Sequence, residues 1–426
     1  MKVKAITLGC KVNTYESEFI LSKFLDKGYE VSIDKSDIYI INTCSVTNMS
    51  DAKSRKVINK ITRENPNAII VVMGCMIEAH KDYQNDEVSI IIGNKDKSKV
   101  VELVEEYIKN KENKKILYND FDSSFEDMFI THMNEHTRAY VKIEDGCENF
   151  CSYCIIPYTR GKVRSKDPDK VILEITNLVD NGYKEVVLTG IHTGHYGSDI
   201  ETSFPELLKR ICKINGLRRL RISSIEITEL DDDFLEVLKN NKVIVNHMHI
   251  PLQSGSDTIL KLMNRKYLTD YYENKINIIR SIRPDISIST DIIVGFPSET
   301  DELFKETLDF ASKMKFSKIH VFPFSVRHGT VAETMNNQID DVTKKERVKE
   351  LVQLSNKLEQ DYMNNYIGQV VEVLIETNNE CESIGHTENF LKVKIYDNIN
   401  SNEIVKVKIN KLNNLILEGE LYEKIK

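Results

Sequence analysis

Three cysteines in the middle of the chain have a spacing that suits an iron–sulfur cluster. Cys147, Cys151 and Cys154 lie in the run DGCENFCSYCIIPYTRG, directly after a predicted strand. Three thiolates on a four-iron cluster leave one iron without a protein ligand, and that iron can bind the amino and carboxylate groups of S-adenosylmethionine. Zinc is the alternative, but three close thiolates without a nearby fourth Cys or His form an incomplete structural zinc site. The run therefore favours radical chemistry over a zinc site.

Three further cysteines each follow a predicted strand near the N-terminus. Cys10, Cys44 and Cys75 end the runs ITLGC, IINTC and VVMGC. Because the carboxyl ends of parallel strands share one edge of a sheet, residues about 31–34 apart in sequence can meet in space. A buried, inert side chain is the ordinary explanation for any one cysteine. Their recurrence at the same place in successive units instead predicts a second three-thiolate cluster.

Glycines precede several of these cysteines. Gly9, Gly74 and Gly146 each stand one residue before a predicted ligand. A residue without a Cβ lets the backbone approach a bulky cluster, and its N–H can donate to a cluster sulfur. The two remaining cysteines, Cys212 and Cys381, stand alone and are interpreted as structural.

The composition is that of an ordinary globular protein. The chain has 426 residues, of which 41% are hydrophobic and 29% charged, with a net charge of −8. Its longest nearly unbroken apolar run, Ala68–Ile77, is far shorter than the ~18 residues of a membrane helix. The N-terminus lacks the pattern of a secretory signal. We therefore expect a cytoplasmic protein without a membrane partner, whose cysteines bind metal or act in catalysis rather than form disulfides.

The first part of the chain alternates short apolar runs with helical patterns. Val3–Leu8, Asp37–Asn42 and Ile69–Met73 are predicted strands, and a fourth unit begins at Asp86. This alternation predicts an α/β domain over residues 1–110, a doubly wound parallel sheet covered by helices. Residues 111–137 are polar and irregular, which is typical of a linker.

A second alternating series follows over residues 138–365. Six strands are predicted there: Tyr140–Ile143, Glu185–Leu188, Leu220–Ser223, Val245–Ile250, Ile286–Val294 and Lys318–Phe322. Six βα units in a row favour an open or partial βα barrel, with function at the carboxyl ends of its strands. Asp341–Asn364 is a long charged helix. From 366 to 426, alternating strands predict a small antiparallel β-barrel.

The sequence resembles a known family along nearly its whole length. The C-x3-C-x2-C run looks like the radical S-adenosylmethionine signature, and its combination with three upstream cysteines and a small terminal barrel resembles the methylthiotransferases. That resemblance implies an N-terminal methylthiotransferase domain, a radical barrel and a C-terminal TRAM domain. Four segments resemble the branch acting on N6-threonylcarbamoyladenosine in tRNA: GCKVN (Gly9–Asn13), NTCSVTN (Asn42–Asn48), PLQSGS (Pro251–Ser256) and MNRKY (Met263–Tyr267).

The reaction that the resemblance implies replaces an unactivated C2–H of the adenosine next to the anticodon by S–CH3. A side-chain acid or base cannot remove that hydrogen, so a radical is needed. The resemblance implies two [4Fe-4S] clusters and S-adenosylmethionine. The cluster on Cys147, Cys151 and Cys154 would generate the radical, and the other would hold the sulfur to be transferred. Expected partners are tRNA, a flavodoxin- or ferredoxin-like electron donor and a sulfur source.

Four residues near predicted strand ends are candidates for binding the cofactor. Gly190, in LTGIHTG, would let the backbone approach it, although a simple turn explains it equally well. Glu226 ends RISSIE and would bind an amino group or ribose hydroxyls, and the alternative is a charge at a helix start. Gln253 and Asp291 also lie near strand ends, and we expect one or two of the four to contact the cofactor.

A basic run after Cys154 is the candidate for contacting RNA. Tyr158, Arg160, Lys162 and Arg164 would hold the phosphate backbone near a flipped base, with a solvated loop as the alternative. The family usually has Arg where Lys166 stands, so a bidentate contact is not expected there. His247 and His249 share one strand face and resemble a metal pair, but we interpret them as core or strand-surface residues.

Other functions remain open at this stage. The same radical chemistry would suit N6-isopentenyladenosine in tRNA, or an Asp of a ribosomal protein. From a different class, the chain would be a two-cluster electron carrier or a zinc-stabilised RNA-binding protein. Formation of 5′-deoxyadenosine from S-adenosylmethionine separates an enzyme from a binding protein.

Overall fold

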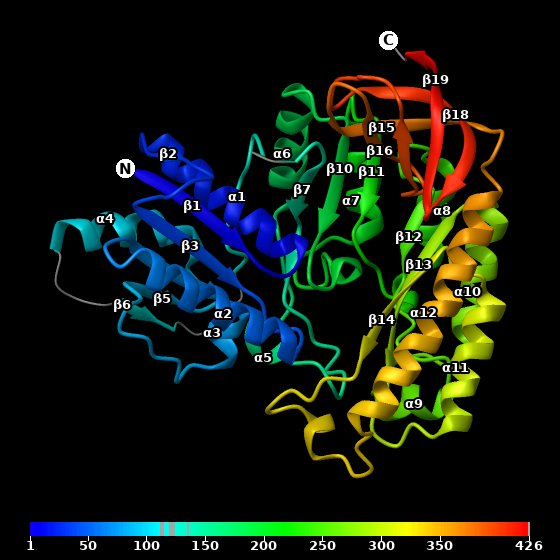
Figure 1. Cartoon of the computed structure of the whole chain (residues 1–426), viewed down its shortest axis with the longest axis horizontal. Helices are drawn as coiled ribbons and strands as arrows, with labels where there is room; N and C mark the ends of the chain where they lie inside the picture. Colours follow the sequence, from blue (N-terminus) through cyan, green and yellow to red (C-terminus); the bar gives the residue numbers. More distant parts are fainter. Residues whose placement is uncertain (111–114, 119–123, 134–135, 425–426) are drawn as a thin grey trace.

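The computed structural model describes residues 1–110, 115–118, 124–133 and 136–424. Three parts follow one another along the chain, as Figure 1 shows. An N-terminal α/β part is coloured blue, a central series of βα units runs from cyan-green to yellow, and a C-terminal β-barrel is orange to red. Within the described residues, none of the helices has the length and apolar character needed to cross a membrane.

The N-terminal part contains a six-stranded parallel sheet in the order β2-β1-β3-β4-β5-β6. Its strands are β1 (Lys2–Thr7), β2 (Glu30–Val31), β3 (Ile38–Thr43), β4 (Ile69–Gly74), β5 (Ile90–Ile92) and β6 (Lys115–Leu117). Its helices are α1 (Lys11–Asp26), α2 (Asn48–Glu64), α3 (Cys75–Ala79) and α4 (Val100–Asn110).

Side chains of the central strands alternate between two cores, because successive residues of a strand face opposite sides. On β3, Ile38 and Ile40 join the core under α1 and α4, whereas Tyr39 and Ile41 join the core under α2 and α3. Both faces are therefore covered, and the predicted doubly wound parallel sheet is confirmed.

The segment predicted as a linker contributes to the folded structure. Lys115–Leu117 form β6 and pair in parallel with β5. Farther along, Met128, Ile130 and Met133 are buried in the large core. The linker interpretation of 111–137 was therefore wrong for the strand β6 and for the three buried residues. Hydrophobic residues are too sparse in this polar segment for the sequence pattern to predict their burial. The linker prediction also covers residues 111–114, 119–123 and 134–135, which lie outside the described residues.

The central part contains the six predicted strands as two three-stranded parallel sheets, β7-β10-β11 and β12-β13-β14. A parallel bridge between Leu220 and Ile244 joins the two sheets into an open, partial barrel. The strands are β7 (Ala139–Lys142), β10 (Glu185–Thr189), β11 (Arg219–Ile222), β12 (His247–His249), β13 (Ser287–Val294) and β14 (Lys318–Pro323).

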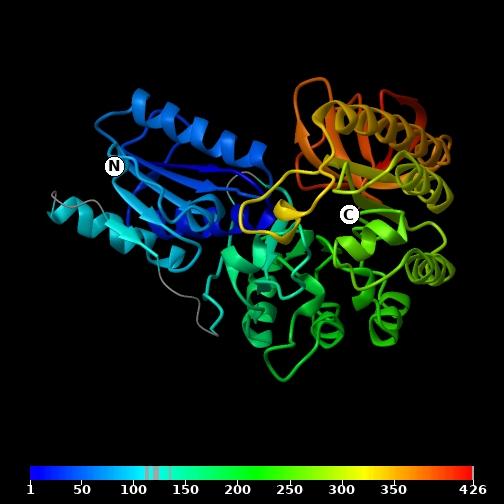
Figure 2. The same cartoon turned by 90° about the horizontal axis from the view of Figure 1, so that it is seen from below.

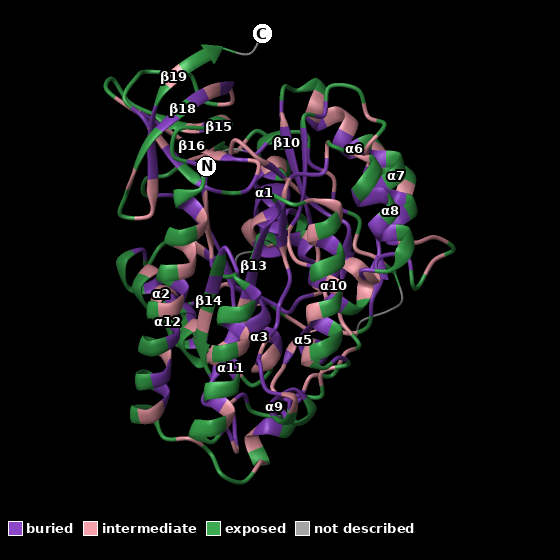
Figure 3. Ribbon diagram, turned by 90° about the vertical axis from the view of Figure 1, so that its right-hand side faces the viewer, coloured by how far each residue is buried: buried purple, intermediate pink, exposed green. Residues whose placement is uncertain are grey.

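Amphipathic helices cover the outside of this partial barrel: α6 (Pro168–Asp180), α7 (Phe204–Ile211), α8 (Asp232–Asn240), α9 (Asp257–Leu262), α10 (Thr269–Ile282) and α11 (Asp301–Met314). Figure 2 shows them as a ring around the strands, and Figure 3 shows that their buried sides face those strands. One hydrophobic cluster includes Tyr15 and Phe19 of α1 as well as Val141 of β7 and Leu188 of β10. The first part therefore packs on the barrel through a continuous core.

The long helix α12 (Asp341–Asn364) leads to the last part, with the bounds predicted from its charge pattern. There β15 (Val370–Asn378), β16 (Ser383–Thr387), β17 (Lys392–Ile395), β18 (Ile404–Asn413) and β19 (Ile416–Lys424) form a closed barrel. Closure places β17 beside β19 in parallel, so the barrel departs from the purely antiparallel arrangement predicted. Its core is separate and includes Val373, Val393 and Val407.

Candidate functional site

The first three cysteines lie at the ends of three adjacent strands. Cys10 caps the N-terminus of α1 after β1, Cys44 follows β3, and Cys75 begins α3 directly after β4. The strand order β1-β3-β4 brings these positions to one sheet edge. Gly9 has a φ of +102°, and a Cβ built on it would lie 2.8 Å from Cys44 Cβ and 2.9 Å from Cys44 Sγ. Glycine is therefore required for the backbone before Cys10 to approach Cys44.

The surroundings of these thiols disfavour three free thiolates. Burial raises the pKa of the Cys44 thiol to about 11, and the nearby Cys75 and Cys10 act in the same direction. Asn94, just after β5, donates from Nδ2 to Cys75 Sγ over 3.4 Å. Cys44 and Cys75 are buried and Cys10 is exposed. Buried thiolates need a cation to compensate their charge, and soft thiolates suit iron–sulfur clusters. The donor set fits a cluster with one iron free of protein ligands.

The second cysteine group begins at a tight turn after β8 (Glu144–Asp145) and ends just before α5 (Ile156–Arg160). Gly146 has a φ of +93°, and a Cβ there would lie 1.9 Å from the carbonyl oxygen of Lys162. The N–H of Cys147 donates to the carbonyl of Gly161 over 3.0 Å. This contact fixes the cysteine loop against the strand β9 (Arg164–Ser165) that pairs with β8.

Electrostatics again point to a cation among these thiols. The pKa values of Cys147 and Cys154 are raised to about 12, mainly by burial, and the thiol of Cys151 acts on both in the same direction. Arg265 donates from Nη1 to Cys151 Sγ over 3.2 Å and forms an ion pair with Glu226. A guanidinium at hydrogen-bond distance supports a thiolate sulfur. These residues fit a second iron–sulfur cluster.

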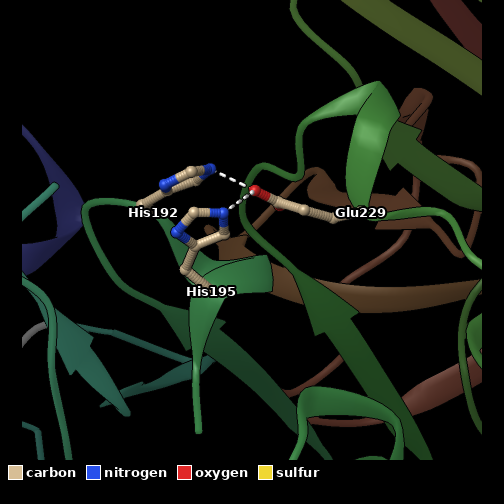
Figure 4. A group of neighbouring side chains, drawn as sticks. All are labelled: His192, His195 and Glu229. Atoms are coloured by element: carbon tan, nitrogen blue, oxygen red, sulfur yellow. Dashed lines mark ion pairs between the residues drawn. The ribbon is translucent and has the colours of Figure 1, made fainter. Parts of the chain in front are cut away.

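Two histidines and a glutamate form a cluster, whose three side chains Figure 4 shows. The rings of His192 and His195 stack with centroids 3.8 Å apart, and both approach the carboxylate of Glu229. Burial lowers the pKa of His195 to about 4, so this ring is neutral near neutral pH. The other ring nitrogen of His192, Nδ1, lies 3.7 Å from Cys147 Sγ. Glu229 therefore fixes the ring that contacts a predicted cluster ligand.

The structure contradicts the RNA-binding prediction for two residues. Arg160 is fully buried and donates to Asp145, Glu16 and Asn13 at 2.8–3.1 Å. Arg164 is also buried and donates to the carbonyls of Arg160 and Lys162, each over 2.9 Å. The partners come from α1 and β8, so Arg160 joins the first part of the chain to the barrel and leaves no face for a phosphate.

The remaining members of the basic run differ in exposure. Tyr158 and Lys162 are exposed, and Tyr158 contacts Phe150 edge to face with ring centroids 6.0 Å apart. Both stay predictions as RNA contacts. Lys166 is buried and paired with Glu174, so it is part of the core rather than a phosphate contact.

The four candidate cofactor residues have different immediate neighbours. Gly190 packs against Glu144, whose Oε2 lies 2.7 Å from where a Cβ would be. Glu226 lies with Arg265 beside Cys151. Gln253 has a φ of +67°, and its N–H donates to the carbonyl of Asp291 over 2.8 Å. Glu226 thus lies near the second cysteine group, and the roles of all four stay predictions.

Asp291 lines a cavity of about 830 Å³ bounded by all three parts of the chain. Gly9 and Lys11, which flank Cys10, come from the first part, Arg221 from β11, and Phe390 from the C-terminal barrel. His247 and His249 also line it, and each bonds to Ser289 Oγ, at 3.1 and 3.0 Å. A chamber beside Cys10 that is large enough for a nucleoside is the feature that sequence reasoning did not identify.

Sequence reasoning also missed three residues that contact the cysteines: Asn94, His192 and Arg265. Each lies in a loop after a strand or helix, and their partners are 19, 45 and 114 residues away. His192 and Arg265 stand in the quoted segments LTGIHTG and MNRKY. A polar residue directly after a strand, as with Asn94 after β5, was the available signal.

Three family models match the chain in the same order as its three parts. They are "Uncharacterized protein family UPF0004" over residues 2–93, "Radical SAM superfamily" over 141–311 and "TRAM domain" over 364–422. The chain is 42% identical to the threonylcarbamoyladenosine tRNA methylthiotransferase MtaB of Bacillus subtilis (strain 168), covering 97% of this chain and 95% of that protein. The MtaB of Aquifex aeolicus (strain VF5) is 38% identical, covering 92% and 96%.

Solved structures share the fold at low sequence identity. The radical S-adenosylmethionine methyltransferase TsrM of Kitasatospora setae, solved with cobalamin and a [4Fe-4S] cluster, has a TM-score of 0.58 and 11% identity, covering 78% of this chain and 74% of that one. Radical S-adenosylmethionine enzymes bind a [4Fe-4S] cluster and S-adenosylmethionine, and methylthiotransferases carry two clusters, which agrees with two three-cysteine groups. The chain belongs to the radical S-adenosylmethionine methylthiotransferase family and is a tRNA methylthiotransferase of the MtaB type.

Proposed function

We propose that this chain converts N6-threonylcarbamoyladenosine next to the anticodon of tRNA into its 2-methylthio derivative. The main support for this substrate is the identity of 42%, over nearly the full length, to a protein named for that activity. The tRNA-2-methylthio-N(6)-dimethylallyladenosine synthase of Thermoanaerobacter sp. (strain X514) is 33% identical, covering 99% of this chain and 92% of that one. The isopentenyl substrate is therefore not favoured.

The six cysteines have different roles in this proposal. Cys147, Cys151 and Cys154 would hold the cluster that binds S-adenosylmethionine, and Cys10, Cys44 and Cys75 the cluster that carries the sulfur. When bound, these groups supply the one-electron cleavage of the sulfonium and the sulfur that is transferred. The chain positions both: Gly9 and Gly146 allow close backbone approach, while Arg265 and Asn94 donate to thiol sulfurs.

The three parts divide the work in this proposal. Residues 1–110 and 138–365 each hold one cluster, and residues 366–426 contact tRNA, with Tyr158 and Lys162 as further candidate contacts. A flavodoxin- or ferredoxin-like protein supplies electrons, another protein supplies sulfur, and the enzyme works in the cytoplasm. The match of residues 364–422 to the TRAM domain supports the tRNA contact.

Nucleoside mass spectrometry of tRNA from a deletion strain tests the substrate. We expect 2-methylthio-N6-threonylcarbamoyladenosine to disappear and the unthiolated nucleoside to accumulate. The intact gene should reverse both changes. A variant with Cys147, Cys151 and Cys154 replaced by Ala should fail to restore it. Loss of the isopentenyl derivative instead would refute the proposed substrate.

A further inference from the structure

The cavity beside Cys10 contains polar groups that the protein itself leaves unpaired. Arg221 is 3% exposed, yet its Nη2 has no hydrogen-bond partner among the described residues, and the same holds for Nδ1 of His247. The ammonium group of Lys11 likewise has no hydrogen-bond or ion-pair partner in the described part of the chain. All three residues line the cavity. Nη2 of Arg221 and Nδ1 of His247 are buried, whereas Lys11 is exposed, so its ammonium is the cation that a ligand in the cavity can reach.

The charges around Lys11 leave the cavity wall positive. Arg138 and Arg221 lie close enough to act on Lys11 as like charges, whereas Asp291 and Cys10 are the opposing groups. Asp291 is already 3.3 Å from His249 Nε2. Arg221 donates from Nε to Glu185 and from Nη1 to the carbonyl of Glu388, which hold its charge in place beside the cavity. A ligand carrying an oxyanion would complete this set.

An aromatic wall faces the same space. Phe390, from the loop between β16 and β17, lines the cavity, and its ring is held by Arg138 and Arg221, whose guanidinium carbons lie 4.9 and 4.8 Å from the ring centroid. His386 stacks on the ring with centroids 4.8 Å apart. The ring of Phe390 thus positions two cationic groups beside the cavity, where they suit a ligand with a negatively charged substituent.

We propose that Lys11, with Arg221 as a second positive charge nearby, binds the carboxylate of the threonylcarbamoyl group on the substrate adenosine and so selects this nucleoside. This inference rests on the proposed function and adds the residues that read the substrate. Because Lys11 directly follows Cys10 in the chain, its ammonium anchors the nucleoside next to the first cysteine group. A neutral N6 substituent would not form the ion pair with Lys11, so other modified adenosines would bind more weakly.

The test compares two anticodon stem-loop RNAs that differ in one group. One carries N6-threonylcarbamoyladenosine and the other the same nucleoside with its carboxylate converted to the neutral amide. With the reconstituted enzyme, we measure kcat/KM for methylthio product, and Kd by fluorescence anisotropy without S-adenosylmethionine. The wild type should prefer the carboxylate RNA by about 10- to 100-fold in both quantities.

Lys11→Met should remove most of this preference by weakening the carboxylate RNA while leaving the amide RNA nearly unchanged. Lys11→Arg, which keeps the charge, should retain it. Lys318→Met is the matched control, because Lys318 lines the same cavity but is paired with Glu359 at 2.9 Å. It should retain the preference. Iron content of about eight per chain in every variant shows that the clusters are intact.

Each other outcome is decisive. If Lys11→Met weakens both RNAs equally, the residue contacts a phosphate or acts structurally, and the proposal is overturned. If it raises the KM for S-adenosylmethionine with no change in RNA preference, the oxyanion is that of the cofactor, and the proposal is likewise overturned. If the wild type thiolates neither RNA while it still cleaves S-adenosylmethionine, the proposed function itself has failed, which is a different result.

Discussion

Replacing Gly9 by Ala should remove one cluster and spare the other. The new Cβ would lie 2.8 Å from Cys44 Cβ and 2.9 Å from its Sγ, so Cys44 would have to move by about 0.6 Å to reach an ordinary contact of 3.4 Å. Metal–ligand distances tolerate only about 0.2 Å. We expect iron to fall from about eight to about four per chain after anaerobic reconstitution, while 5′-deoxyadenosine formation continues.

Gly28→Ala is the matched control for this experiment. Gly28 also has a positive φ, +82°, but a Cβ there would meet no atom within 4 Å. Both variants incur the backbone cost of about 1–2 kcal/mol, measurable by urea denaturation, and only Gly9→Ala adds the collision with a ligand. Gly28→Ala should hold about eight iron. If Gly9→Ala also holds about eight and still makes methylthio product, the close approach at Cys44 does not matter for the cluster.

Three further predictions concern stability. Lys166→Met leaves the buried carboxylate of Glu174 without its cationic partner. Urea denaturation should show that the free energy of unfolding falls by about 3–5 kcal/mol. A loss below about 1 kcal/mol would contradict the buried ion pair. Burial would raise the pKa of Asp145, but Arg160, Lys142 and Arg164 together outweigh burial and hold that pKa below its ordinary value. The stability this contributes is complete above pH ~4 and is lost as the pH falls through the folded-state pKa, so acid unfolding of Arg160→Met should begin at a higher pH than that of the wild type. Phe390→Ala removes two cation–π contacts and should cost the docked C-terminal barrel about 1–3 kcal/mol, seen as faster amide exchange in β15–β19.

The local hydrophobic pattern of the sequence was enough to predict where the first three cysteines lie. Apolar runs that end at Cys10, Cys44 and Cys75 are real strands, and their parallel order puts the three residues at one sheet edge, as predicted. The helix Asp341–Asn364 was likewise predicted from its local charge pattern, and the structure adds a capping Asp340 that accepts from two backbone N–H groups. These features depend on neighbours in sequence, which the period of a strand or helix reveals.

The predictions that failed concern residues whose partners are distant in sequence. Arg160 looked like an RNA contact because it stands in a basic run, but its partner Glu16 is 144 residues away on α1. A single sequence does not show that pairing. The free Nη2 of Arg221 and the position of Phe390 beside it arise only when the C-terminal barrel docks on the partial barrel. The sequence pattern therefore could not predict the cavity, because it does not show which of these residues meet in the folded chain.

Iron counting on three forms of the chain tests the central claim, that each three-cysteine group holds its own cluster. After anaerobic reconstitution, the wild type should hold about eight iron, and the Ala variants of Cys10, Cys44 and Cys75 or of Cys147, Cys151 and Cys154 about four each. The first variant should still cleave S-adenosylmethionine, and the second should not. A colourless wild type that contains zinc, or a triple variant that keeps eight iron, would contradict the account.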